Sequence, residues 1–261
     1  MSQRNRIRSA FGSAPDYEGH ARIQRDVAAT LAARIAGLDL APAPRVLEIG
    51  CGTGFLTRAL IERGIGGDWL VTDIAPEMVE RCRAAAPPCD ASRTLRFATL
   101  DGEHGTPEGA PFDLICSSLA MQWFDDTPAA LARLAQWLAP GGHLVITTLG
   151  PRSFGEWRAA HAAQGIAPGT PAFAAVDAFA TLSPETLIVE DVTERHPDPR
   201  SFLRAVKAIG AGTSAPSHRP LTPAQLRSVM ARFAQSGCEV TYEVVTCHLH
   251  RATTFPYVSP Q

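Results

Sequence analysis

Short apolar runs alternate with helical patterns through the first half of the chain. The runs are rich in aliphatic and β-branched residues and predict strands. They are Arg45–Ile49, Trp69–Asp73, Thr94–Thr99, Phe112–Ser117 and His143–Leu149. Ahead of the first run, Val27, Leu31, Ile35 and Leu38 recur every three or four residues and predict a helix. Strands that alternate with helices at short spacing predict parallel pairing in an open α/β sheet.

A further helix is expected between the fourth and fifth runs. Thr127-Pro128 has the sequence of an N-cap followed by a first-turn proline, and Pro140-Gly141-Gly142 is expected to end the helix.

The pattern loosens after Gly150. Residues 151–182 are rich in Ala, Gly and Pro, and they predict an insertion with short helices. Two later segments alternate as strands do, and two others predict helices. The strands are Leu187–Arg195 and Val240–His250; the helices are Pro199–Ile209, ended by Gly210-Ala211-Gly212, and one opened by the capping-box spacing of Thr222 and Gln225.

Composition and charge exclude several classes of function. The 261 residues are 45% apolar and 19% charged, and their net charge is −2, as in ordinary globular proteins. This balance gives no reason to expect nucleic acid or an anionic membrane as a partner. The N-terminal MSQRNRIRSAFG lacks an apolar region after its basic residues, and no uninterrupted apolar stretch approaches about 18 residues. We therefore expect a cytoplasmic protein without a signal peptide or membrane span.

The cysteines and histidines do not predict a metal site. No cysteine pair has the C-x-x-C spacing, so we expect all six to be reduced. They are Cys51, Cys82, Cys89, Cys116, Cys238 and Cys247. His248 and His250 alternate on a predicted strand like half of a metal site, but the sequence supplies no evident third ligand.

Three glycines follow the first predicted strand in RVLEIGCGTGFLTR, residues 45–58. Gly50, Gly52 and Gly54 predict a backbone that turns sharply or lets a ligand approach closely. The usual dinucleotide motif G-x-G-x-x-G is not matched, because Phe55 stands where that motif requires glycine. A P-loop lysine is also missing, which disfavours a nucleoside triphosphate.

Two acidic residues and a small-residue turn follow the next strands. Asp73 ends the second strand in WLVTDIAPEM, where a carboxylate can bind two neighbouring ribose hydroxyls. Asp101, in ATLDGE, can accept a hydrogen bond from an exocyclic amine. The fourth strand leads into the turn of FDLICSSLAMQW. Together these positions predict a nucleoside-like ligand without a pyrophosphate.

In this order, the four stretches resemble the motifs of class I S-adenosylmethionine-dependent methyltransferases. The resemblance implies a Rossmann-like fold with a seven-stranded, mostly parallel sheet, an antiparallel last strand and helices on both faces. It implies S-adenosyl-L-methionine as cofactor, S-adenosyl-L-homocysteine as product, and no metal. The implied cofactor-binding residues are Gln24, Glu48, Gly50, Cys51, Gly52, Gly54, Asp73, Ile74, Met78, Leu100, Asp101, Gly102, Ser117, Leu119 and Gln122.

The N-terminal segment narrows the resemblance. A helix that begins near Tyr17 would place Tyr17, His20 and Gln24 on one face, as in a lid over a ligand; a surface helix with incidental polar residues is the alternative. The run AFG-x-A-x-x-YE-x-HA-x-x-QR, with SLAMQW, TTLGPRSFGEW and AVKAIGAG, resembles the malonyl-acyl-carrier-protein O-methyltransferases of biotin synthesis, the BioC family. The likeness extends from about Ala10 to Arg251.

This resemblance implies methyl transfer to the free carboxylate of a malonyl thioester. Tyr17 and His20 would then line the reacting centre. The malonyl group would be carried by acyl carrier protein, with coenzyme A as the alternative. The candidate substrate-binding residues are Trp123, Arg152, Arg200, Arg204 and Lys207. A guanidinium or ammonium group would bind the carboxylate, and a basic helix face would attract an acidic carrier.

We expect one domain over residues 1–261. Residues 1–38 would form the lid segment, 45–150 the cofactor-binding half, and 151–250 the insertion and closing strands. Three other functions remain open. They are methylation of another small-molecule carboxylate, hydroxyl or amine; a methyltransferase-fold assembly factor; and a nucleotide-dependent oxidoreductase, which Phe55 disfavours.

Overall fold

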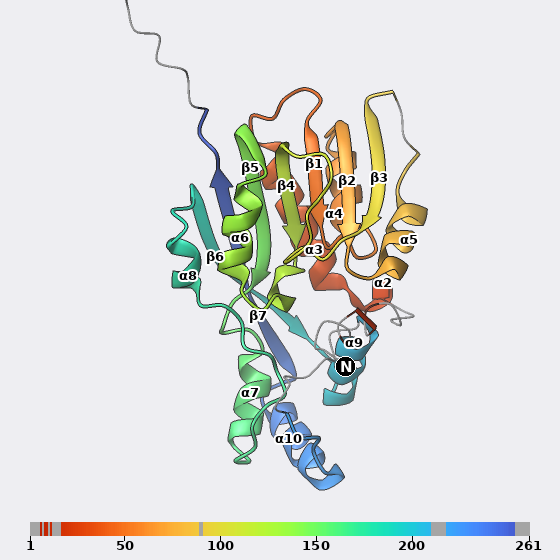
Figure 1. Ribbon diagram of the computed structural model, residues 1–261. Coiled ribbons are helices and arrows are strands. Elements are labelled where there is room, and N and C mark those ends of the chain that lie inside the picture. The colour runs from red at the N-terminus through yellow and green to blue at the C-terminus, as the bar shows by residue number, and fades with distance from the viewer. Residues whose placement is uncertain are drawn as a thin grey trace, which may run out of the picture.

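Seven strands form one twisted sheet in the order β3-β2-β1-β4-β5-β7-β6 (Figure 1). The computed structural model describes residues 6, 8, 9, 11, 17–88, 91–209 and 218–253, and of Tyr17 only the backbone. The strands are β1 Arg45–Ile49, β2 Gly67–Asp73, β3 Arg93–Thr99, β4 Phe112–Ser118, β5 Leu138–Leu149, β6 Thr186–Arg195 and β7 Glu239–His250. The first five are mutually parallel, and β7 runs antiparallel to both β5 and β6. The expected fold class is therefore confirmed, including the antiparallel last strand.

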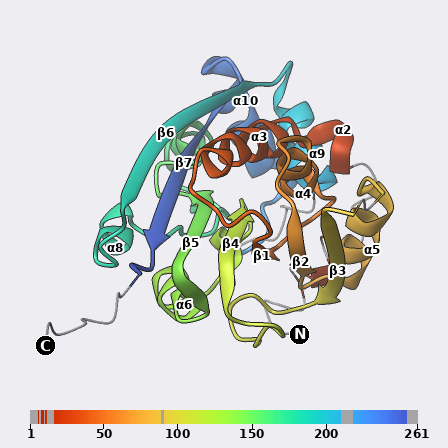
Figure 2. The ribbon, with the colours of Figure 1, turned by 90° about the horizontal axis from the view of Figure 1, so that it is seen from above.

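The sheet is covered on both faces by helices, as Figure 2 shows from above. Successive residues of each buried strand contribute to opposite faces, so Val46 and Leu47 belong to different hydrophobic clusters. The first face packs against α3 Arg22–Ala36, α4 Phe55–Glu62 and α5 Pro76–Ala85. The second packs against α6 Thr127–Ala135 and α8 Val176–Ala180.

A third group of helices lies beyond the lower end of the sheet in Figure 1. These are α7 Gly155–Ala162, α9 Pro199–Ala208 and α10 Pro223–Gln235. Trp157, Phe202 and Phe233 join them in a hydrophobic cluster with the first turns of α3. The capping box that opens α10 is present, because Gln225 N donates to Thr222 Oγ1 and Thr222 N donates to Gln225 Oε1. The glycines expected to end α9 lie outside the described residues.

The segment that covers α6 and the start of β5 differs from the sequence prediction in two ways. The N-cap of α6 is Asp126, whose side chain accepts a hydrogen bond from Ala129 N, and Thr127 is already helical. The stretch Pro140-Gly141-Gly142 does not end this helix but lies inside β5, where the pairing with β4 shifts register. Glycines suit such an irregularity: Gly141 has a φ of 78°, and a Cβ on Gly142 would lie 2.9 Å from Phe112 O.

Among the described residues, no helix combines the length and the apolar character that a membrane crossing needs.

Candidate functional site

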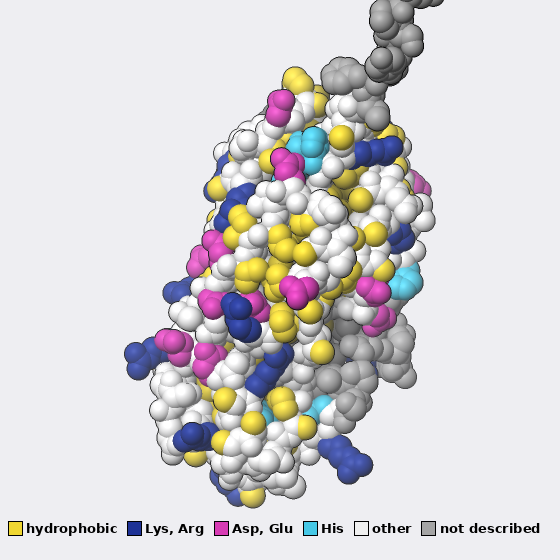
Figure 3. All heavy atoms as spheres, turned by 90° about the vertical axis from the view of Figure 1, so that its left-hand side faces the viewer, with side chains coloured by type: hydrophobic (Ala, Val, Ile, Leu, Met, Phe, Trp, Pro, Cys, Tyr) yellow, Lys and Arg dark blue, Asp and Glu magenta, His cyan; other side chains and the backbone are white. Residues whose placement is uncertain are grey.

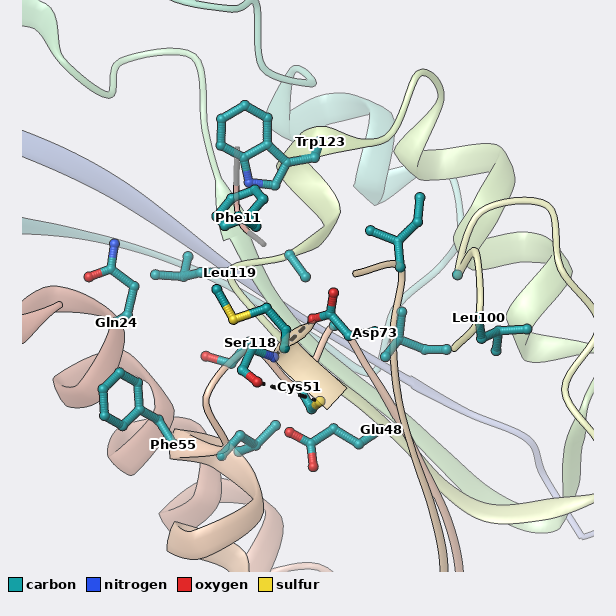
Figure 4. A pocket seen from close by; sticks show the side chains of 18 of the residues that line it. Phe11, Gln24, Glu48, Cys51, Phe55, Asp73, Leu100, Ser118, Leu119 and Trp123 are labelled. Carbon is teal, nitrogen blue, oxygen red and sulfur yellow. Dashed lines mark hydrogen bonds between the residues drawn. The ribbon is translucent and has the colours of Figure 1, made fainter. Parts of the chain in front are cut away.

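The candidate site lies where the strand order reverses, between β1 and β4. These strands are neighbours, but their connections lead to opposite sides of the sheet, so a crevice opens beyond their carboxyl ends. A cavity occupies this crevice, with side chains from several loops converging on it (Figure 4).

The glycine loop after β1 forms the floor of this cavity. Gly50, Gly52 and Gly54 have φ angles of 72°, 54° and 89°, a region that other residues adopt at a cost. At Gly50, an added Cβ would also lie 2.3 Å from the Cβ of Ala120, in the turn after β4. The glycines thus permit both the left-handed turn and the close approach of the two loops.

Asp73 ties the end of β2 to the glycine loop. Its Oδ2 accepts a hydrogen bond from Gly52 N at 2.9 Å, and its Oδ1 accepts one from Ala75 N at 2.9 Å. Burial raises the pKa of Asp73, although the backbone donors oppose the shift. The carboxylate is thus partly engaged, but each oxygen retains a lone pair that a ligand hydroxyl can use.

Glu48 is a second buried carboxyl group in the cavity wall. It is 1% exposed, and burial raises its pKa to about 7 from an ordinary value of 4.5. Thr57 Oγ1 donates to its Oε2 at 2.7 Å. At neutral pH this group can therefore change its charge with a small change in its surroundings.

Most of the predicted cofactor-binding residues line this cavity. Those that do are Gln24, Glu48, Gly50, Cys51, Gly52, Asp73, Ile74, Met78, Leu100, Asp101, Gly102 and Leu119. Three do not. Gly54 is the N-cap of α4 and packs against Cys82, Gln122 lines a second cavity, and the buried Ser117 is replaced in the wall by Ser118.

The second cavity adjoins the first and has a volume of about 540 Å³, within the range of small-molecule sites. Its lining is largely apolar and includes Trp157 and Phe202 from the third group of helices and Phe173 from the loop before α8. The two cavities share four lining residues: Phe11, Gln24, Leu119 and Trp123. Phe11 and Trp123 stand edge to face with their ring centroids 5.5 Å apart (Figure 4). This shared boundary is where groups bound in the two cavities would meet.

The lid residues are not aligned along one helix. α2 covers Tyr17–His20, and Ala21 interrupts it before α3 begins at Arg22. His20 is exposed and lines neither cavity, whereas Gln24 reaches both. The side chain of Tyr17 lies outside the described part of the structure, so its predicted role stays a prediction.

The four candidate cations differ in whether they line a cavity. Arg152 lines neither cavity, because its guanidinium pairs with Glu243 Oε1 at 2.9 Å and with Asp191 Oδ1 at 3.0 Å. Arg200 and Arg204 are exposed on α9 and also lie outside both cavities. Lys207, on the same helix, lines the second cavity. Of the four candidate cations, Lys207 is the one that lines a cavity.

Among the described residues, the cysteine that lines the first cavity is held in its thiol form. Cys51 lines the first cavity, and a hydrogen bond with Cys82, together with burial, raises the pKa of its thiol well above the ordinary value. The five cysteines among the described residues are free, and Cys89 lies outside them.

Comparison with known proteins decides the family. A methyltransferase-domain model matches residues 46–142. The chain is 39% identical over 250 residues to the malonyl-acyl-carrier-protein O-methyltransferase of Magnetococcus marinus, covering 94% of this chain and 92% of that one. The chain belongs to the malonyl-acyl-carrier-protein O-methyltransferase family. It is also 46% identical over 239 residues to the biotin biosynthesis bifunctional protein BioCD of Bordetella avium, where the match covers 91% of this chain and half of that relative.

Solved structures share the fold of this family member. The N-methyltransferase NodS of Bradyrhizobium japonicum, in complex with S-adenosyl-L-homocysteine, superimposes with a TM-score of 0.51 at 16% identity. The match covers 96% of this chain and 99% of that chain. At this identity the likeness concerns the fold alone.

In this malonyl-acyl-carrier-protein O-methyltransferase family member, the first cavity is also lined by residues that were not among the predicted cofactor-binding residues. They include Phe11, Thr53, Phe55 and Phe124. Thr53 has the clearest polar role, because its Oγ1 is buried and has no hydrogen-bond partner among the described residues. The sequence did carry a signal for Thr53, because its hydroxyl group lies between Gly52 and Gly54, which were both predicted cofactor-binding residues.

Proposed function

We propose that this chain transfers a methyl group from S-adenosyl-L-methionine to the free carboxylate of a malonyl thioester carried by acyl carrier protein. The observation that carries the proposal is a pair of adjoining cavities with a shared boundary, one lined by the glycine loop and the carboxyl groups of Glu48 and Asp73, the other mainly by aromatic and aliphatic side chains. Family membership supports the reaction and its place in biotin synthesis, because the relatives are named for both.

We assign the cofactor to the first cavity because of the residues that line it. Asp73 would bind the ribose hydroxyls through its remaining lone pairs, and Asp101 would lie beside the nucleoside on the other side. The unpartnered Thr53 Oγ1 offers a hydrogen bond to a ligand at the methionine end of the loop. When bound, the cofactor supplies an electrophilic methyl group on a sulfonium. In its ionised form, Glu48 would stabilise such a cation nearby.

The second cavity would hold the malonyl group with its carboxylate at the shared boundary. A malonyl carboxylate is ionised at neutral pH, so it is already nucleophilic and needs no general base. The remaining task is orientation, which in favourable cases lowers a barrier by roughly 7–11 kcal/mol. Gln24 and Trp123 would position the reacting groups, and the apolar walls would exclude water. Tyr17 remains a candidate for the reacting centre, whereas His20 would have to move to reach it, because it is exposed and lines neither cavity.

Lys207 would attract the carboxylate into the second cavity, and the exposed Arg200 and Arg204 on the same helix would guide an acidic carrier protein. Coenzyme A would make less use of these arginines, because it presents a smaller charged surface. We further propose that the whole chain acts as one domain, with the helices after β5 serving the substrate.

The test supplies S-adenosyl-L-methionine with a labelled methyl group to the purified protein. Malonyl-acyl carrier protein is the substrate, with acetyl-acyl carrier protein as control because it lacks the free carboxylate. Base-labile label on the malonyl species alone is the expected result. Label on neither species, with cofactor binding retained, would overturn the substrate assignment and favour another acceptor or an assembly factor.

The role of Lys207 has its own control. Lys207→Gln should raise the KM for malonyl-acyl carrier protein at least severalfold while leaving cofactor affinity unchanged. Arg227→Gln removes an equal charge from the exposed face of α10 and should change neither quantity. Equal KM values for the two variants would remove Lys207 from substrate binding.

A further inference from the structure

Strands β5 and β7 and the residue before β6 bring metal-binding side chains together at the end of the sheet opposite the cofactor cavity. His143 opens the regular part of β5, and His248 and His250 lie near the end of β7. His143 pairs directly with His250, and Val145 pairs with His248. Residues two apart on a strand share a face, so all three imidazoles lie on one face of the sheet.

A carboxylate ligand comes from Glu185, the residue that precedes β6. Glu185 N donates to His248 O at 2.9 Å, which fixes Glu185 beside the histidines. Its Oε2 lies 3.9 Å from His248 Nε2 and 3.6 Å from His250 Nδ1. Figure 3 views the molecule from the side of β6 and α8. It shows histidine and acidic side chains next to each other near the upper end. The sequence could not reveal the grouping, because His143 and Glu185 are distant from β7 along the chain.

We propose that His143, His248 and Glu185 form a binding site for a divalent transition-metal ion of the zinc type. His143 Nδ1 and His248 Nε2 are 3.0 Å apart, and one donor atom from each of the three residues lies within 4.8 Å of the others. Two ligand atoms on one tetrahedral zinc ion lie roughly 3.3–3.5 Å apart, given bonds of about 2.0–2.2 Å. Small rotations of these side chains therefore suffice.

The buried histidines and the exposed glutamate are compatible with the binding of an ion that enters from solvent. His143 and His248 are 8% and 7% exposed, so their rings are held in place, whereas the side chain of Glu185 is 55% exposed and free to close on an ion. Burial lowers the pKa of both buried histidines, and a metal binds the neutral imidazole.

Two imidazoles and one carboxylate match the preferences of zinc and its neighbours, and leave a fourth position for water. The site joins β5, β7 and the edge strand β6, so its effect would be on the stability of this edge rather than on methyl transfer. This departs from the expectation of no metal, which rested on the cysteine spacing, on the missing third ligand and on the family resemblance.

The experiment titrates tag-free, chelator-treated protein with ZnCl2 in competition with a chromogenic chelator. One equivalent should bind, and CoCl2 should give the intense visible absorption of a four-coordinate ion. His248→Gln and Glu185→Gln should each weaken zinc binding at least tenfold. Glu185 is exposed, so its replacement should not disturb folding, which the metal-free melting temperature would verify.

His196→Gln is the matched control. His196 is buried beside a carboxylate, with Nε2 3.5 Å from Glu194 Oε2, but it belongs to no cluster of three ligands among the described residues. Its replacement should leave zinc affinity unchanged. The proposal is overturned if the wild-type protein binds no stoichiometric zinc, or if His248→Gln and Glu185→Gln bind it as tightly as the wild type.

Discussion

Glu48 should make the protein less stable as the pH rises towards neutrality. Its pKa is about 7 in the folded chain against an ordinary value of 4.5, because the carboxyl group is buried. Between pH 4.5 and pH 7 the folded state therefore keeps a proton that the unfolded state has released. The stability from this group is fully present below pH 4.5 and is lost as the pH rises through 7. At roughly 1.4 kcal/mol per pKa unit, the loss is about 3 kcal/mol.

Glu48→Gln isolates this effect. The amide has nearly the same shape and can still accept the hydrogen bond from Thr57, but it does not ionise. We expect the variant to gain about 3 kcal/mol in unfolding free energy relative to wild type between pH 4.5 and pH 8, with most of the gain below pH 7. Urea unfolding of both proteins without cofactor, at intervals of one pH unit, measures the difference and cancels the contribution of other titrating groups.

The same substitution should act in the opposite direction on cofactor binding. A cationic sulfonium favours the ionised form of Glu48, so S-adenosyl-L-methionine should bind the wild type more tightly at pH 8 than at pH 6 and should release a proton near pH 7. In Glu48→Gln this pH dependence should disappear, which calorimetry in buffers of different ionisation enthalpy would detect. Parallel stability curves for the two proteins would refute the reasoning, because Glu48 would then titrate alike in the folded and unfolded chains.

Three further changes test the cavity. Asp73→Asn should weaken cofactor binding by roughly 1–3 kcal/mol in calorimetry, since a charge-assisted acceptor is lost; unchanged affinity would remove Asp73 from the ribose. Gly50→Ala should lower the melting temperature by several degrees and impair cofactor binding, because its Cβ would lie 2.3 Å from that of Ala120 and its φ is 72°. Full binding by that variant would show that the two loops separate easily. Tyr17→Phe should lower turnover with little change in cofactor affinity, whereas wild-type turnover would mean that its hydroxyl takes no part.

The sequence predicted the sheet well because its signals are local. The alternation within β6 and the apolar run of β1 depend on residues next to each other, and both strands are confirmed with ends shifted by at most one residue. The start of β5 was missed because Pro140-Gly141-Gly142 has the composition of a helix end, while its position in a strand depends on pairing with β4. Local composition could not report that pairing.

The site was predicted best where it follows strand ends and least where it depends on packing. Asp73 and Asp101 reach the cavity because parallel strands end at one edge of a sheet. The position of Phe11 depends instead on how the N-terminal segment packs over the cavity, which no local pattern reports. Arg152 lies outside both cavities because it forms an ion pair with the buried Glu243. Glu243 is on β7, far from Arg152 along the chain, so no local pattern connects the two residues.

Lys207 also has a consequence for chemical labelling. It is the only lysine in the chain, it is exposed, and it lines the second cavity. Apart from the N-terminus, an amine-selective reagent therefore has one target, and that target lies inside the proposed substrate site. A fluorophore or crosslinker attached through its amine would report on occupancy of the cavity without any engineered cysteine.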